Sequence, residues 1–95
     1  MRESEIERKA CQLCELHGVL HYKFVSPQRR GVPDRLLIFL GGLHWFVEFK
    51  APDGRLSKLQ IHEQKKLMKH GAKVTTVYSY EEFERHFAQA LFPGP

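Results

Sequence analysis

The sequence has 95 residues, a formal net charge of +4 and 42% hydrophobic residues, which predicts one domain over residues 1–95 and excludes a separate substrate-binding domain. Two cysteines, the lack of a long apolar run and the absence of a signal-peptide pattern in "MRESEIERKA" favour a soluble intracellular protein with reduced thiols. Between Lys23 and Lys73, basic residues outnumber acidic ones by eleven to four. This local excess indicates a polyanionic partner such as nucleic acid, although a merely solvated basic face explains it equally well.

The first half of the chain predicts one helix and three strands. Apolar residues from Ile6 to Leu13 recur at helical spacing, and Gly18 follows as a C-terminal cap, so a helix is expected over 3–18. Three segments rich in β-branched and aromatic residues predict strands: 19–25, 35–40 and 44–49. The last two strands are expected to form a hairpin around the Gly41-Gly42 turn.

The second half predicts a helix, a strand and a terminal helix. A helix over 57–71 is expected to open with a capping box of Ser57 and Gln60, and a short strand follows over 73–79. Ser79 and Glu82 predict a second capping box at the start of the last helix. The order α-β-β-β-α-β-α favours an α/β fold with a central mixed sheet flanked by helices.

A pair of charges interrupts the apolar strand "HWFVEFK". Because strand side chains alternate, Glu48 and Lys50 project from one face and Phe49 from the other. Buried charges are unfavourable without partners, and a divalent cation bound by Glu48 and by Asp34 of "GVPDR" would compensate. Two hard oxygen ligands suit Mg²⁺ or Mn²⁺, and Lys50 would assist the nucleophilic water or neutralise a phosphate.

The hairpin register decides whether Asp34 shares a face with Glu48. A strict two-residue turn at Gly41-Gly42 would place Asp34 opposite Phe49, on the wrong face. A three-residue loop from Gly41 to Leu43, or a bulge, would place Asp34 opposite Lys50. A metal site therefore predicts an odd loop or a bulge, unless Asp34 lies outside the ladder and turns in.

The strings "GVPDR" and "VEFK" resemble the PD-(D/E)xK nuclease signature. The longer run "KFVSPQRRGVPDR…GG…FVEFK…S…Q" is similar to the stand-alone virus-type replication-repair nuclease (VRR-NUC) domain, over nearly the whole chain. The resemblance implies a restriction-endonuclease-like fold and a Mg²⁺- or Mn²⁺-dependent endodeoxyribonuclease. It assigns the metal to Asp34 and Glu48 and makes Lys50 the catalytic lysine. It also implies an acid on the first helix, for which Glu7 fits best and Glu3, one turn earlier, is the alternative.

Further site residues carry weaker signals. The family favours a glutamine at the start of the second helix, which Gln60 matches, although its capping-box role is a sufficient explanation. The backbone carbonyl of Phe49 is an additional candidate metal ligand. Candidate contacts to the DNA backbone are Ser26, Arg29, Arg30, Arg35, Arg55 and Lys58.

The resemblance implies a homodimer that cuts branched DNA in the manner of a Holliday-junction resolvase, because a two-fold dimer supplies matched sites for paired cuts. Phe83, Phe87 and Leu91 share one helix face and are candidates for the dimer surface, unless they fold into the monomer's own core. A phage-encoded protein acting in the host cytoplasm fits this description. The alternatives are a flap or nicking nuclease and a non-catalytic nucleic-acid-binding module. Carboxylates directed at the DNA phosphates favour the nuclease over the binding module, since without a cation these acids would repel the DNA.

Overall fold

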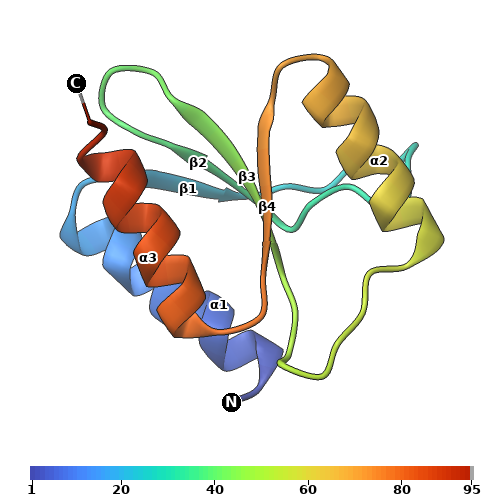
Figure 1. The fold of residues 1–95 in the computed structure, drawn as a ribbon, viewed down its shortest axis with the longest axis horizontal. Helices are drawn as coiled ribbons and strands as arrows, with labels where there is room; N and C mark the ends of the chain where they lie inside the picture. The colour runs from blue at the N-terminus through green and yellow to red at the C-terminus, as the bar shows by residue number, and fades with distance from the viewer. Residues whose placement is uncertain (95) are drawn as a thin grey trace.

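The computed structural model describes residues 1–94, and its elements follow the predicted order. They are α1 (Glu3–Leu16), β1 (Leu20–Lys23), β2 (Arg35–Ile38), β3 (His44–Phe49), α2 (Lys58–Lys69), β4 (Lys73–Val77) and α3 (Tyr80–Leu91) (Figure 1). No helix among the described residues is long and apolar enough to cross a membrane.

The four strands form one mixed sheet in the order β1-β2-β3-β4. β1 and β3 both pair antiparallel with β2, and β3 pairs parallel with β4. Helices α1 and α3 lie side by side on one face of the sheet, and α2 covers part of the other face beside β4 (Figure 1). The carboxyl end of β3 therefore lies between α2 and the start of α1.

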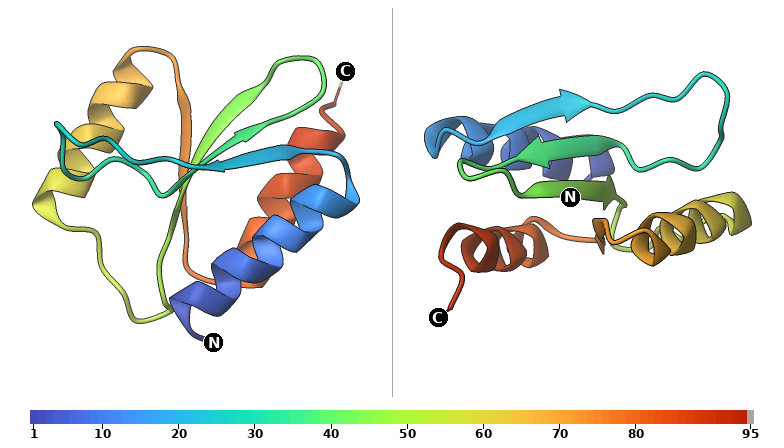
Figure 2. Two further views of the ribbon diagram at one scale, coloured as in Figure 1. Left: turned by 180° about the vertical axis from the view of Figure 1, so that it is seen from behind. Right: turned by 90° about the horizontal axis from the view of Figure 1, so that it is seen from above.

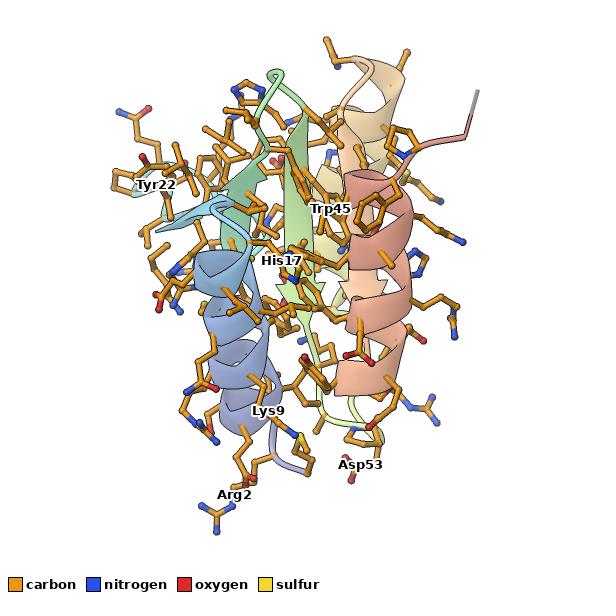
Figure 3. The ribbon with its side chains drawn as sticks, turned by 90° about the vertical axis from the view of Figure 1, so that its left-hand side faces the viewer. Arg2, Lys9, His17, Tyr22, Trp45 and Asp53 are labelled. Atoms are coloured by element: carbon orange, nitrogen blue, oxygen red, sulfur yellow. The ribbon has the colours of Figure 1, made fainter. Side chains whose placement is uncertain are left out.

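The core lies between the sheet and the pair α1 and α3. Trp45 of β3 is buried in this layer and stacks on Phe83 of α3, with ring centroids 5.6 Å apart (Figure 3). Phe49 and Phe87 are buried in the same cluster. Phe83 and Phe87 of α3 thus belong to the monomer's own core, which was the alternative to a dimer surface. These two side chains offer no surface to a second chain.

Capping contacts explain where two helices begin. Ser57 Oγ accepts a hydrogen bond from the Gln60 N–H, and Gln60 Oε1 accepts one from the Ser57 N–H, which confirms the predicted capping box of α2. At α3, Ser79 Oγ accepts from the Glu82 N–H. The reciprocal contact predicted there is wrong, because Glu82 Oε1 accepts from Tyr78 N–H, one residue before the cap.

The β2–β3 hairpin has an odd loop, as predicted, but at a different position. Ile38 pairs with His44, and the Phe39 N–H donates to the Leu43 carbonyl, so the loop comprises Leu40 to Gly42 and not Gly41 to Leu43. Both glycines have positive φ and Leu40 is fully exposed at the tip. Extending this register places Asp34 opposite Glu48, so the predicted pairing with Lys50 is wrong although the shared face is correct.

Candidate active site

Asp34 lies where the β1–β2 connection enters β2. The register places Pro33 opposite Phe49, and proline has no N–H to donate to the Phe49 carbonyl. The Phe49 N–H, by contrast, has a partner, because it donates a hydrogen bond of 3.0 Å to Asp34 Oδ2. The Asp34 carboxylate is thus fixed against the end of β3, and the Phe49 carbonyl faces a residue that cannot bond to it.

Glu48 is 2% exposed, and its two oxygens have different surroundings. Oε2 accepts a hydrogen bond of 3.2 Å from Gln60 Nε2 and lies 3.9 Å from Lys50 Nζ. Oε1 is buried without a hydrogen-bond partner. Burial and the neighbouring Asp34 carboxylate raise the pKa of Glu48 to about 8, against a smaller lowering by Lys50. A carboxylate in this position is electrostatically unsatisfied and favours a positively charged ligand.

Gln60 connects the start of α2 to this acid. Its amide oxygen completes the capping box with Ser57, while its amide nitrogen donates to Glu48. Lys50 is held from the other side, because its backbone N–H donates to the Val77 carbonyl of β4. The structure therefore brings together Asp34, Glu48, Lys50 and Gln60 at the carboxyl end of β3.

Glu7 is not brought to this group. Its Oε2 accepts a hydrogen bond of 2.6 Å from Arg35 Nε and lies 3.5 Å from Lys23 Nζ, in the layer between α1 and the sheet. Arg35 follows Asp34 directly in the chain and therefore points to the opposite face of the sheet. Arg35, predicted to contact DNA, is thus engaged with Glu7. On α1 it is the charge of Glu3 that contributes to raising the pKa of Glu48.

The residues at the end of β3 fit a divalent cation. Within residues 1–94, no three His, Cys, Asp or Glu side chains gather in a way that would hold a metal ion. Mg²⁺ is commonly bound through one or two carboxylates, with water and phosphate completing its coordination. Asp34 and Glu48 supply such a pair, and the partnerless Glu48 Oε1 is a buried oxygen that a cation would satisfy.

Five of the six predicted DNA contacts lie in or directly beside the two connections near this end of the sheet. Arg29 and Arg30 are exposed in the β1–β2 connection, where Ser26 is half-buried, and Arg55 and Lys58 are exposed at the approach to α2. Arg29 Nη1 lies 3.6 Å from Oε1 of Glu63 on α2, a contact that no pattern in the sequence predicted.

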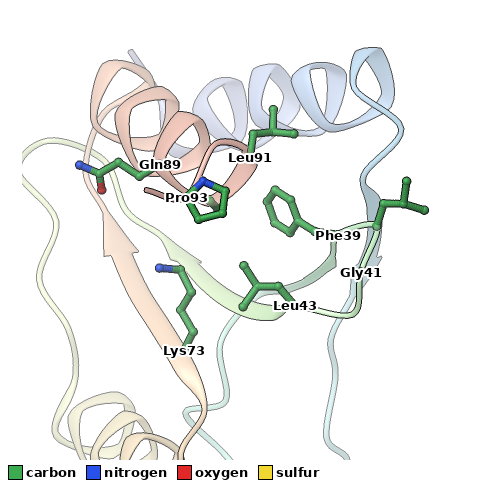
Figure 4. Close-up of a pocket in the computed structure, with 9 residues that line it drawn as sticks. Phe39, Gly41, Leu43, Lys73, Gln89, Leu91 and Pro93 are labelled. Atoms are coloured by element: carbon green, nitrogen blue, oxygen red, sulfur yellow. The ribbon is translucent and has the colours of Figure 1, made fainter. Parts of the chain in front are cut away.

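A cavity of about 580 Å³ lies at the other end of the sheet, beside the hairpin tip (Figure 4). Phe39, Leu43, Leu91 and Pro93 contribute to its mainly apolar lining, and Lys73 is its charged residue. No carboxylate lines it, so this cavity lacks the acids that the chemistry requires.

Gly31 sets the position of the connection that carries Asp34. A Cβ at Gly31 would lie 2.6 Å from the backbone carbon and oxygen of Leu59, and φ of Gly31 is +84°. We expect Gly31→Ala to lower the free energy of unfolding by at least about 1 kcal/mol more than Gly71→Ala does. Gly71 is the matched control, because its φ is +88° but a Cβ there meets nothing within 4 Å.

Urea denaturation of the two variants beside the wild type measures this difference. Equal losses in Gly31→Ala and Gly71→Ala would mean that only the backbone conformation matters, and that the connection does not rest on α2.

The fold and the residues at the end of β3 define a domain of the PD-(D/E)xK nuclease class. The chain is 40% identical over 81 residues to "Putative nuclease p44" of Acyrthosiphon pisum secondary endosymbiont phage 1, over 85% of this chain and 87% of the relative. A solved structure described as "VRR_NUC domain" superposes with a TM-score of 0.84 at 30% sequence identity, covering 90% of this chain and 94% of the other. No family model matches the chain. The chain belongs to the VRR-NUC family, and both likenesses support a nuclease.

Proposed function

We propose that the protein is a Mg²⁺- or Mn²⁺-dependent endodeoxyribonuclease that hydrolyses phosphodiester bonds. The observation that carries this proposal is the buried Glu48, with one oxygen unpaired, beside Asp34 and within reach of Lys50 and Gln60. A module that only binds nucleic acid gains nothing from two adjacent carboxylates, which repel phosphate without a cation.

Each residue of the site has a defined role in this proposal. Asp34 and Glu48 would hold the ion, with the Phe49 carbonyl as a further oxygen and Glu3, in place of Glu7, as the acid of the first helix. The ion, when bound, acts as a Lewis acid that activates water and offsets the charge of the phosphate. Lys50 stabilises negative charge that develops on the reacting phosphate. Gln60 is a positioning residue, because its hydrogen bond holds Oε2 of Glu48 while Oε1, which has no hydrogen-bond partner, would be available to an ion.

The proposed substrate is branched DNA, and the proposed active species is an intracellular homodimer. The basic connections around the site support a DNA partner, and the implied junction-resolving activity requires two cuts on opposed strands. Since Phe83 and Phe87 are buried, the apolar surface open to a second chain lies elsewhere, for example at the hairpin tip around Leu40 and at Phe92.

Cleavage of a DNA panel tests the proposal. We expect the protein to cut a labelled four-way junction in Mg²⁺ or Mn²⁺, with paired nicks placed symmetrically about the branch, and to sediment at about twice its chain mass of 11.1 kDa. EDTA abolishes the cleavage. Calcium supports binding without turnover, because its looser coordination positions the nucleophile less well.

Matched flap, nicked and linear substrates are the controls in this experiment. A monomer that cuts linear duplex as fast as the junction would contradict the branched substrate and leave a general nuclease. Preferred cutting of the flap or nicked DNA would favour the flap or nicking alternative. Binding without cleavage in every metal would leave the non-catalytic module.

A further inference from the structure

Glu63 of α2 is a buried acid outside the proposed metal site. Its side chain is 9% exposed, and its Oε1 lies 3.2 Å from Lys66 Nζ and 3.6 Å from Arg29 Nη1. The hydrogen bond from Lys66 lowers the pKa of Glu63, with a smaller contribution of the same sign from Arg29. A carboxylate at this burial is tolerated only with such partners.

The two partners of Glu63 have different structural consequences. Lys66 is on the same helix, one turn away, so its contact fixes no other element. Arg29 belongs to the connection between β1 and β2, which runs alongside α2 (Figure 2, left). The ion pair between Arg29 and Glu63 therefore ties a long connection to a helix.

A second contact holds the same connection against α2. The close approach of Gly31 to the Leu59 backbone lies two residues after Arg29. Three residues further on, Asp34 is bonded to the Phe49 N–H of β3. The connection is thus anchored at Arg29, Gly31 and Asp34. The partner of Arg29 is Glu63, an acid that has no role in the proposed chemistry.

We propose that Glu63 is a positioning residue that orients Arg29, and with it the β1–β2 connection, for contact with the DNA backbone. This inference rests on the proposed function. The Arg29 side chain remains 61% exposed, and a guanidinium has five N–H donors in a fixed planar arrangement. It can therefore pair with Glu63 through one nitrogen and keep other donors free for a phosphate.

Glu63→Gln separates positioning from simple electrostatics, because the two predict opposite signs. Removing a negative charge beside a surface that binds a polyanion should by itself strengthen DNA binding. If Glu63 positions Arg29, the same substitution should weaken DNA binding even though the net charge becomes more positive.

The first measurement is the affinity of the full chain for a fluorescent four-way junction in Ca²⁺. We expect Glu63→Gln to raise Kd roughly threefold to fivefold, the factor that an ion pair of this exposure supports. Arg29→Ala should give a similar loss, and the double variant should lose little more than either single variant. Glu81→Gln is the matched control, because it removes one acid from an exposed position on α3 and should leave Kd unchanged or slightly lower.

The second measurement needs no DNA. Trypsin cleaves after Arg29 and Arg30, and we expect the initial rate of these cuts to rise severalfold in Glu63→Gln and to stay at the wild-type rate in Glu81→Gln. Circular dichroism verifies that each variant is folded. Unchanged proteolysis, or DNA binding as tight as in the wild type, overturns the inference. If the wild type binds no DNA, the proposed function fails, and the positioning of Arg29 for DNA fails with it, whereas the proteolysis still reports whether Glu63 anchors the connection.

Discussion

Lys50→Ala is expected to lower the single-turnover rate of DNA cleavage about 100-fold to 1,000-fold, while DNA affinity stays within about twofold of the wild type. Lys50 lies 3.9 Å from Glu48 at the end of β3, and its side chain is 17% exposed. A cation in this position acts mainly on charge that develops in the transition state, so its loss affects the rate far more than binding. Quenched-flow cleavage with excess enzyme, together with binding in Ca²⁺, measures both quantities.

Lys58→Ala provides the matched control for this prediction. Lys58 is an exposed lysine at the start of α2, near the same end of the sheet, and it is a candidate phosphate contact. Its loss should weaken binding and reduce the salt dependence, with the single-turnover rate preserved at saturating enzyme. Asp34→Asn should instead lose cleavage as severely as Lys50→Ala. Near-normal cleavage by either Lys50→Ala or Asp34→Asn would remove these residues from the chemistry.

The placement of Asp34, Glu48 and Lys50 on one face could be predicted from the sequence because it depends on strand alternation. Glu48 and Lys50 had to share a face, and Asp34 could join them through an odd hairpin loop, through a bulge or by turning in from outside the ladder. The position of that loop did not follow, since Gly41 and Gly42 permit several odd loops. The structure settles it, because Phe39 pairs with Leu43 and shifts the register by two residues relative to the expected one.

The first-helix acid shows where spacing along one helix was insufficient. Glu3 and Glu7 lie on the same helix face, so their periodicity does not distinguish them. The difference comes from β1 and β2, where Lys23 and Arg35 point toward α1 and engage Glu7. Strand alternation in the sequence already predicts that Arg35 and Asp34 point to opposite faces of the sheet. This distinguishes Glu7 from Glu3 only once α1 is known to cover the face to which Arg35 points.

The contact between Arg29 and Glu63 was not predictable for a similar reason. It joins a connection without regular structure to a helix, and neither residue follows a periodic pattern that would bring them together. The sequence offers only that Glu63 is the one acid on a helix rich in lysine. That Glu63 is buried can be recognised only once the orientation of α2 against the sheet is known.

Glu48→Gln is expected to raise the thermal stability of the protein in EDTA while abolishing cleavage. In the wild type, Glu48 Oε1 is buried without a partner and Asp34 lies beside it. A glutamine keeps the shape, accepts the hydrogen bond from Gln60 and offers an N–H donor where two acids now oppose each other. A gain of about 1 kcal/mol, the lower range for satisfying a buried polar group, corresponds to roughly 4–8 °C in Tm.

The gain should increase with pH. The pKa of Glu48 is about 8 in the folded protein and 4.5 in its ordinary state, so the folded state holds more protons between these values. Wild-type stability therefore contains a contribution that is present below pH 4.5 and is lost as the pH rises through 8. Glu48→Gln lacks that loss, so the difference in Tm between variant and wild type should be larger at pH 9 than at pH 6.

Glu63→Gln is the control for Glu48→Gln, because both acids are buried: as whole residues, Glu63 is 7% exposed and Glu48 is 2% exposed. The Glu63 carboxylate has Lys66 and Arg29 as partners, so neutralising it should lower Tm instead of raising it. Calorimetry in EDTA, and again with Mg²⁺ or Mn²⁺, completes the test, because the ion should stabilise the wild type and not Glu48→Gln. A destabilised Glu48→Gln, or one that the ion stabilises as much as the wild type, would contradict a cation site built on this unpaired oxygen.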